Sequence, residues 1–327
     1  MFPFISFSGV EPRSQEFALL NPPGETTRRP LHIGFVGYGE AGSAIANGLA
    51  REPGTVVHVY DPTFTGRTTA AGRTAPDSLV VATSVGALTA ACTIVLSTVV
   101  AAAAVAVAEE LAPHVGPGHL VADLNSVSPA TKERISTIVS ASGAAFVEAA
   151  IMTNISANGH GTPIYACGER AGEFAALVGE RGMNVDNLGP DLGQASATKM
   201  FRSIIAKGLE ALLLESLTAA ARYDVADRVL AKVEEGYPGL RWSALADHLL
   251  GRTAVHGRRR ADEMFEVAAT LEELGMSPFM AAGAAHRIRE SGTALEGAFA
   301  TAPSRYQDVV AILAAPLPHS ATEGQTR

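Results

Sequence analysis

Cysteine is almost absent from this chain. Its 327 residues include only Cys92 and Cys167, which lie far apart in the sequence. Two distant cysteines build neither a disulfide framework nor a CxxC metal pair, and they suit a reducing, cytoplasmic setting. Histidine, cysteine, aspartate and glutamate do not gather at metal-ligand spacing either, so we expect no metal site. The nucleophile motif G-x-S-x-G is also missing.

Long apolar runs and an excess of basic charge are missing too. The longest weakly polar run, from Leu96 to Ala108, is mostly alanine and falls short of the roughly 20 residues that a membrane span needs. The formal net charge is −8, whereas general nucleic-acid binding needs a basic surface. The first thirty residues lack a basic start followed by an apolar core, so we expect no signal peptide. These features predict a cytoplasmic protein whose partners are neither membranes nor nucleic acids.

What the chain does contain is material for two domains. Apolar residues make up 47% of it and charged residues 18%, which is a globular composition. Over residues 31–190, short apolar runs alternate with helical patterns, which predicts a Rossmann-type α/β domain with a mostly parallel sheet. Residues 191–315 keep only helical patterns, with breaks that include Gly251, and predict an all-α domain. Residues 1–30 are expected to form a loosely ordered extension, and 316–327 a flexible tail.

A glycine-rich turn follows the first predicted strand. It has the pattern GxGxxG, with the apolar run LHIGFV before it and the helical pattern EAGSAIANGLA after it. In this context the first glycine permits a tight turn, the second lets a pyrophosphate approach the backbone, and the third lets helix and strand pack closely. The helix N-terminus adds free N–H groups for the phosphates. The predicted cofactor-binding residues of this turn are Gly37, Tyr38, Gly39, Glu40, Ala41 and Gly42.

Three more positions extend this predicted cofactor site. Asp61 ends the second predicted strand, where a carboxylate can bind the adenosine ribose and repel a 2′-phosphate, which favours NAD. Arg67 and Arg73 lie downstream and could hold that phosphate instead, so NADP stays open. Thr98 and Val99 follow the strand TIVLS at the carboxyl end of the sheet. They are expected either to line the nicotinamide ribose or to form a plain loop.

Four stretches of the chain carry a family resemblance. They are GFVGYGEAGSAIANGLA, DLNSVSP (123–129), EAAIMTN (148–154) with NGHGTP (158–163), and GQASATKMFRS (193–203). In this order they resemble the cofactor motif, the substrate loop D-x-S-T-x-x-P, the D-A-P-V-S-G-G segment with its following G-T, and the catalytic-lysine segment of the β-hydroxyacid dehydrogenase superfamily. That superfamily includes 6-phosphogluconate and 3-hydroxyisobutyrate dehydrogenases. Residues 256–278 are similar to the C-terminal domain of a subgroup of NAD(P)-dependent oxidoreductases with a variant helical domain.

The resemblance implies an NAD(P)-dependent oxidoreductase in which Lys199 is the general acid and base. A lysine in a partly dry cleft can do both, because desolvation lowers its pKa toward neutrality. Arg202, one turn further, could pair with a carboxylate, so we expect a small, anionic, 3-hydroxy-acid-like substrate. Lys207 and Glu210 are expected to form an i,i+3 ion pair. The alternatives are an imine reductase-like enzyme and a catalytically inactive dinucleotide-binding sensor or scaffold.

Three positions depart from the family pattern. The serine of the substrate loop falls on Asn125, with Ser126 where the threonine follows. The S-G-G triplet becomes Met152-Thr153-Asn154, and the asparagine four residues after the lysine becomes Ser203. The same chemistry on a different substrate is the simplest interpretation. The resemblance implies these substrate-binding residues: Asn125, Ser126, Thr153, Asn154, Arg202 and Ser203.

One histidine, one basic run and two apolar helix faces complete the candidate features. His160 is either a second acid–base group or an ordinary loop histidine. The basic run 256–260 is either an anion clamp that closes the cleft or a locally ion-paired surface. Broad apolar faces over 209–221 and 264–274 predict that the helical domain packs against a second copy. We therefore expect a homodimer formed through that domain.

Overall fold

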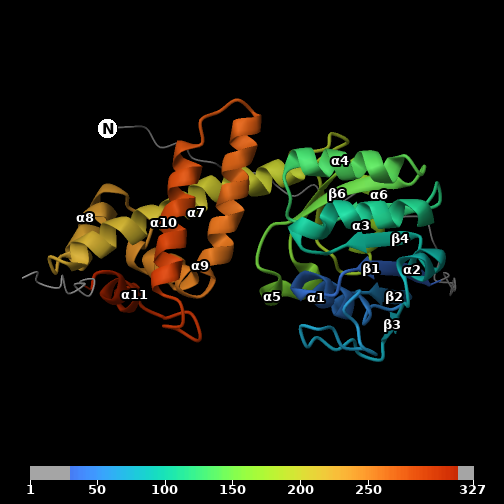
Figure 1. Ribbon diagram of the computed structural model, residues 1–327, viewed down its shortest axis with the longest axis horizontal. Coiled ribbons are helices and arrows are strands. Elements are labelled where there is room, and N and C mark those ends of the chain that lie inside the picture. The colour runs from blue at the N-terminus through green and yellow to red at the C-terminus, as the bar shows by residue number, and fades with distance from the viewer. Residues whose placement is uncertain (1–29, 316–327) are drawn as a thin grey trace, which may run out of the picture.

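The computed structural model describes residues 30–315 and contains a Rossmann-type domain followed by a helical domain (Figure 1). This architecture confirms the predicted fold class. The tail predicted at 316–327 lies outside the described residues, and so does the extension predicted at 1–30, apart from Pro30. Within the described part, none of the helices is both long enough and apolar enough to cross a bilayer.

The described strands form one sheet in the order β3-β2-β1-β4-β5-β6-β7-β8. Neighbouring strands are parallel, except that β6 and β7 are antiparallel. Buried parallel strands need apolar side chains on both faces, which explains the short continuous apolar runs of the sequence. The strands are β1 (Leu31–Val36), β2 (Thr55–Tyr60), β3 (Leu79–Val81), β4 (Ile94–Ser97), β5 (Leu120–Asp123), β6 (Ala145–Ile151), β7 (Ile164–Cys167) and β8 (Val185–Asn187).

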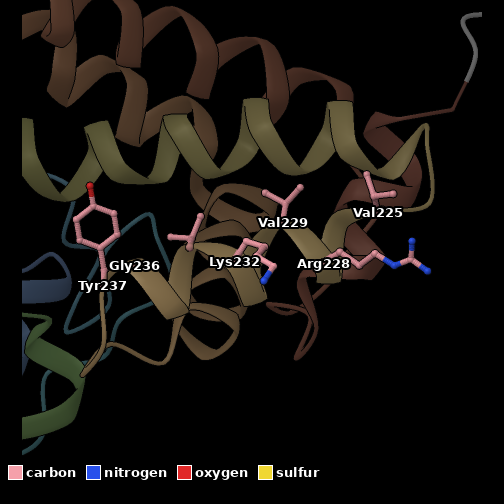
Figure 2. Close-up of a pocket in the computed structure, with 7 residues that line it drawn as sticks. Val225, Arg228, Val229, Lys232, Gly236 and Tyr237 are labelled. Carbon is pink, nitrogen blue, oxygen red and sulfur yellow. The ribbon is translucent and has the colours of Figure 1, made fainter.

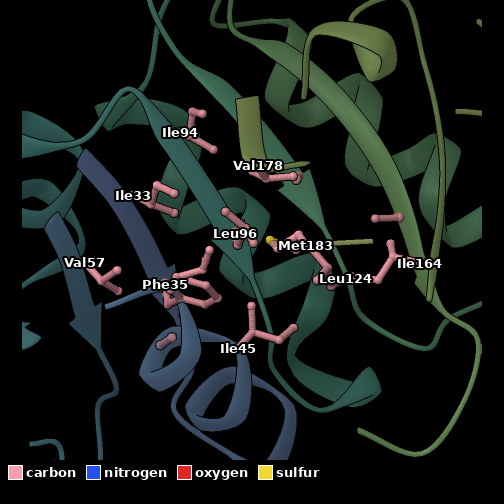
Figure 3. Close-up of a cluster of buried hydrophobic side chains, with 14 of the residues drawn as sticks. Ile33, Phe35, Ile45, Val57, Ile94, Leu96, Leu124, Ile164, Val178 and Met183 are labelled. Atoms are coloured by element: carbon pink, nitrogen blue, oxygen red, sulfur yellow. The ribbon is translucent and has the colours of Figure 1, made fainter. Parts of the chain in front are cut away.

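Helices cover both faces of this sheet. Alternate strand side chains point to opposite faces, so Ile33 and Phe35 of β1 join one apolar core and Val36 joins the other. The first core, shown in Figure 3, also receives Ile45 and Val178. The helices on that side are α1 (Glu40–Leu49), α5 (Ile155–Asn158) and α6 (Ala171–Gly179), and those on the other side are α2 (Val85–Ala91), α3 (Ala104–Leu111) and α4 (Pro129–Ser140).

The helical domain is built on α7, which runs without interruption over Gln194–Ala221. Its apolar core packs α7 against the four helices that follow. These are α8 (Ala226–Gly236), α9 (Trp242–Glu273), α10 (Phe279–Ala294) and α11 (Tyr306–Leu313). The break predicted at Gly251 is wrong, because Gly251 lies inside α9. A Cβ there would come 2.9 Å from the carbonyl oxygen of Pro303, so close packing explains this glycine. The helix instead leaves helical geometry at His256, which has φ −126°.

Candidate active site

The glycine turn between β1 and α1 has the shape of a ligand cradle. Gly37 has φ +98°, and a Cβ on Gly42 would lie 2.3 Å from the carbonyl oxygen of Gly37. Both positions therefore exclude a side chain. Gly39, which begins α1, has no atom within 4 Å of the place where its Cβ would be. The turn is thus tightly packed on its inner side and open at the helix N-terminus, where Glu40 is exposed and Ala41 half-buried.

Tyr38 and Asp61 close one side of this turn. The backbone N–H of Tyr38 donates to Oδ2 of Asp61 at 2.9 Å, and Thr63 donates twice to Oδ1. The Tyr38 ring is buried, and its hydroxyl donates to Asn47 at 2.7 Å, while burial raises the pKa of that hydroxyl. Tyr38 therefore offers only its backbone to the turn. The Asp61 carboxylate is held at the end of β2, beside the cradle.

The two arginines that could hold a 2′-phosphate are placed differently. The Arg67 guanidinium donates to the carbonyl oxygens of Ala75 and Leu79, each at 2.9 Å, and its Nε lies 3.6 Å from the carboxylate of Asp77. It is therefore engaged within its own loop. Arg73 is exposed in the same loop. The charges of both arginines act on the Tyr38 hydroxyl, so both lie near the glycine turn.

Buried polar side chains fix the ends of β4 and β5 against the turn. Thr98 Oγ1 donates to the carbonyl oxygen of Gly37 at 2.8 Å. The N–H of Val99 donates to Oδ1 of Asn125 at 2.7 Å, and Nδ2 of Asn125 donates to Ser97 and to Asp123. The side chains of Thr98 and Asn125 thus bond within the protein. They therefore hold the ends of β4 and β5 beside the glycine turn.

Lys199 and Ser126, predicted from separate motifs, meet in this structure. Nζ of Lys199 in α7 donates to Oγ of Ser126, just after β5, at 2.6 Å. Burial lowers the pKa of Lys199 to about 8, and the positive charges of Lys132, Lys207 and Arg202 act in the same direction. The carboxylate of Glu263 acts in the opposite direction. A lysine with this pKa can give or take a proton near neutral pH.

Beneath this pair lies a buried ion pair that the sequence analysis missed. Lys132 of α4 is completely buried, and its Nζ donates to the Asp123 carboxylate, to the Asp123 carbonyl oxygen at 2.7 Å and to the carbonyl oxygen of Ala149 at 3.1 Å. It therefore ties the end of β5 to β6. A signal was available, because Lys132 shares the buried face of its helix with Ile135 and Val139.

A second missed residue, Glu148, holds the start of α7. Its buried carboxylate accepts from the N–H of Ser196 at 2.6 Å and from the N–H of Gly193. A negative charge at a helix N-terminus satisfies free N–H groups and complements the helix dipole. Glu148 lies on β6, so this cap attaches the helix of Lys199 directly to the Rossmann-type sheet.

The other predicted substrate-binding residues lie on α7 and just after β6. Oγ of Ser203 donates to the carbonyl oxygen of Lys199 at 3.2 Å. Arg202 is exposed on α7, and its charge acts on Lys199. Thr153 and Asn154 are exposed just after β6. The structure brings Arg202 and Ser203 next to Lys199 through the helix itself.

The predicted ion pair between Lys207 and Glu210 is wrong. Lys207 donates to Glu263 of α9, and Glu210 accepts from Thr253 and from both Nε and Nη2 of Arg260. Glu210 is completely buried and Lys207 nearly so. A buried charge needs a partner, and α9 supplies one for each: buried Arg260 for Glu210, and the half-exposed carboxylate of Glu263 for Lys207.

His160 and the basic run 256–260 also have defined places. Nε2 of His160 lies 3.4 Å from the Glu52 carboxylate, and its ring packs against Gly48 in α1, where it is an ordinary loop histidine. In the basic run, Arg258 pairs with Glu296 and Arg260 with Glu210. His256 and Arg259 are exposed. The run is therefore partly ion-paired and partly presented to solvent.

One described cavity lies away from these residues. It measures about 580 Å³ and runs along α8 (Figure 2). It contains none of the predicted site residues, and its lining is mostly apolar: Val225, Arg228, Val229, Lys232, Val233, Gly236 and Tyr237. Among residues 30–315, no three histidine, cysteine, aspartate or glutamate side chains are grouped as metal ligands.

Comparison with known proteins gives two family matches along the chain. Residues 32–177 match the NAD binding domain of 6-phosphogluconate dehydrogenase, and residues 220–291 match a domain of unknown function, DUF1932. A conserved hypothetical protein from Sinorhizobium meliloti is 36% identical, with a TM-score of 0.75 over 87% of this chain and 96% of its own.

Two other solved structures are similar. A conserved protein of unknown function, with structural similarity to 3-hydroxyacid dehydrogenases, is 30% identical over 80% of this chain and 97% of its own, with a TM-score of 0.64. The 3-hydroxyisobutyrate dehydrogenase of Mycobacterium tuberculosis shares the fold at 17% identity. Its TM-score is 0.67, over 88% of this chain and 100% of its own.

Proposed function

Because the chain belongs to the 6-phosphogluconate dehydrogenase-like family of β-hydroxyacid dehydrogenases, in the branch with the DUF1932 domain, we propose that it is an NAD(P)-dependent oxidoreductase. It acts on a small anionic hydroxy or keto substrate. The observation that carries this proposal is the hydrogen bond of 2.6 Å between Lys199 and Ser126. Ser126 follows β5, and the glycine turn follows β1 in the same sheet, so both stand at the carboxyl edge where dinucleotides bind.

The glycine turn fits the phosphates of a dinucleotide. Gly39 leaves space above the N-terminus of α1, while Gly37 and Gly42 fill the inner side. The first N–H groups of α1 would hold the pyrophosphate, and the Asp61 carboxylate would accept from the adenosine ribose. When bound, the nicotinamide supplies or accepts the hydride. NAD is favoured because Asp61 repels a 2′-phosphate and Arg67 is engaged with backbone carbonyls.

Lys199 moves the proton that accompanies the hydride. In reduction its ammonium gives a proton to the carbonyl oxygen, and in oxidation its neutral amine takes a proton from the hydroxyl group. Ser126 holds Nζ in place. The cations Lys132, Lys207 and Arg202 keep the pKa of Lys199 low and attract an anionic substrate to the same place. Arg202, which is exposed beside Lys199, is the proposed partner of the substrate carboxylate.

A substrate screen with a single variant tests this function. The panel holds hydroxy acids, sugar acids, sugar phosphates and imines, and NAD(P)H absorbance reports turnover. We expect turnover of a hydroxy or keto acid that Lys199→Ala abolishes. Imine turnover that survives Lys199→Ala would instead identify an imine reductase. Dinucleotide binding without turnover of any compound would identify a sensor or scaffold, the reading motivated by the altered positions Asn125, Thr153 and Ser203.

We also propose that the protein works as a cytoplasmic homodimer. Cys92 and Cys167 are both buried free thiols, as in a reducing compartment. On α7, Ile205 is 76% exposed and Leu212 58% exposed. These two side chains are seven residues apart and share one face of the helix, which makes an apolar surface suited to a second copy.

A further inference from the structure

One face of α9, called the arginine face, carries two arginines, a histidine and a glutamate. Arg252, His256, Arg259 and Glu263 recur at steps of four, three and four residues, so they lie along one side of this helix. Glu263 accepts a hydrogen bond from Lys207 of α7. Lys207 lies about 12 Å from Lys199 along the axis of α7. The charge of Glu263 acts on Lys199, so the Glu263 end of the row is near the proposed proton-transfer lysine.

The other basic residues of this segment are already paired. Arg258 pairs with Glu296, and Arg260 is buried against Glu210. Among the described residues, by contrast, no carboxylate is in ion-pair contact with Arg252 or Arg259. His256 also departs from helical geometry. Arg258 and Arg260 are thus engaged by the chain's own carboxylates, whereas the guanidinium groups of Arg252 and Arg259 could bind an anionic ligand.

His256, in the middle of this face, lies within electrostatic reach of the N-terminus of α1. In Figure 1, α9 is the helix of the α9–α10 hairpin that lies nearer to the Rossmann-type domain. Glu40, the first residue of α1, is close enough to His256 for its carboxylate to act on the imidazole. Burial and the charges of Arg259, Arg252 and Arg260 lower the pKa of His256. The two arginines supply the positive charge that an anion site requires.

We propose that Arg252, His256 and Arg259 form a phosphate-binding face on α9 near the N-terminus of α1. Two guanidinium groups offer up to five donors each. A phosphate, which has more acceptor oxygens than a carboxylate, matches them better as a ligand. The phosphate belongs either to the dinucleotide or to the substrate. The identity of the ligand rests on the proposed function, but the presence of an anion site does not.

Two neighbouring arginines provide a matched test. Arg259→Gln removes a charge from the proposed face, whereas Arg258→Gln removes the same charge from the adjacent, paired position. Both side chains are exposed, so neither change opens the core. For each protein we would measure the dissociation constants of NADH and NADPH by fluorescence. We would also measure the thermal stabilisation caused by inorganic phosphate at constant ionic strength, with and without saturating NADH.

The outcomes separate the two sources of phosphate. If the face binds the dinucleotide, Arg259→Gln weakens NADH or NADPH about tenfold and Arg258→Gln does not. If it binds the substrate, dinucleotide affinity is unchanged, and only Arg259→Gln abolishes stabilisation by inorganic phosphate. The proposal is overturned if the two variants behave alike in both measurements. If the unmodified protein binds neither dinucleotide, the proposed function fails, while the phosphate titration without NADH still tests the face.

Discussion

At the scale of single residues, Lys199 sets the pH dependence of the proposed reaction. Its pKa is about 8, because burial and nearby cations disfavour the ammonium. Reduction needs the protonated form, so its rate falls as pH rises through about 8; oxidation needs the neutral amine, so its rate rises there. Lys199→Met should remove both of these limbs of the pH–rate profile and lower kcat by roughly 10²–10⁴-fold. The measurement is kcat in both directions across a pH series.

A lysine far from the site is the control for this prediction. Lys232 of α8 is exposed and paired with Glu235, so Lys232→Met should leave both limbs in place. A Lys199→Met enzyme that retains the limb near pH 8 would show that another group moves the proton.

At the same scale, we propose that Asp61 determines the choice between NAD and NADP. Its carboxylate is held beside the glycine turn by Tyr38 and Thr63, in position to accept from a ribose hydroxyl. Asp61→Ser should weaken NADH binding by roughly tenfold or more, because a hydrogen bond to a charged group contributes about 1.5–3 kcal/mol. NADPH should be affected less, because the repulsion of its 2′-phosphate disappears. Fluorescence titration measures both constants.

The exposed neighbour Asp77 serves as the control for Asp61. It belongs to the same loop and lies 3.6 Å from Arg67. Asp77→Ser should therefore leave the ratio of the NADH and NADPH constants unchanged. An equal response of that ratio in the two variants would remove Asp61 from the ribose site.

At the scale of elements, α7 depends on a residue of the sheet. Glu148 of β6 caps the first turn of α7 through the N–H groups of Gly193 and Ser196. Glu148→Gln removes the charge and places an amide donor against a backbone donor. We expect a loss of about 1–3 kcal/mol in the free energy of unfolding, measured by urea denaturation. The control is Glu173, which is exposed and paired with Arg170. Glu173→Gln should lower the free energy of unfolding by no more than about 0.5 kcal/mol. Equal losses in the two variants would show that Glu148 does not stabilise the start of α7.

The same elements explain which parts of the site could be predicted from the sequence. The glycine turn is local, because strand, glycines and helix are contiguous, and the lysine segment matched a family motif. The pairs formed by Lys207 with Glu263 and by Glu210 with Arg260 span 56 and 50 residues. They arise only when α9 packs on α7, so helical spacing alone gave the wrong partner. Glu148 was overlooked for the same reason, since its cap joins residues 45 positions apart.

At the scale of the whole molecule, each domain brings one half of the proposed site. The Rossmann-type domain would supply the glycine turn, Asp61 and Ser126, and the helical domain would supply Lys199 and the arginine face of α9. Lys199 and Ser126 are 73 positions apart, and their hydrogen bond joins the domains at the carboxyl edge of the sheet. Glu148 caps α7 from β6, so it also fixes where Lys199 stands relative to the sheet.

The helical domain is also where we expect the second copy to bind. Ile205 and Leu212 expose apolar side chains on one face of α7, so burying them would stabilise a dimer by roughly 25 cal/mol per Å² of apolar surface. Light scattering should give twice the chain mass of 33.8 kDa. Ile205→Glu combined with Leu212→Glu should shift the protein to the monomer without a loss of helix signal in circular dichroism. Val80→Glu, at an exposed site on β3, should remain dimeric. A monomeric mass for the unmodified protein at all concentrations would refute this assembly.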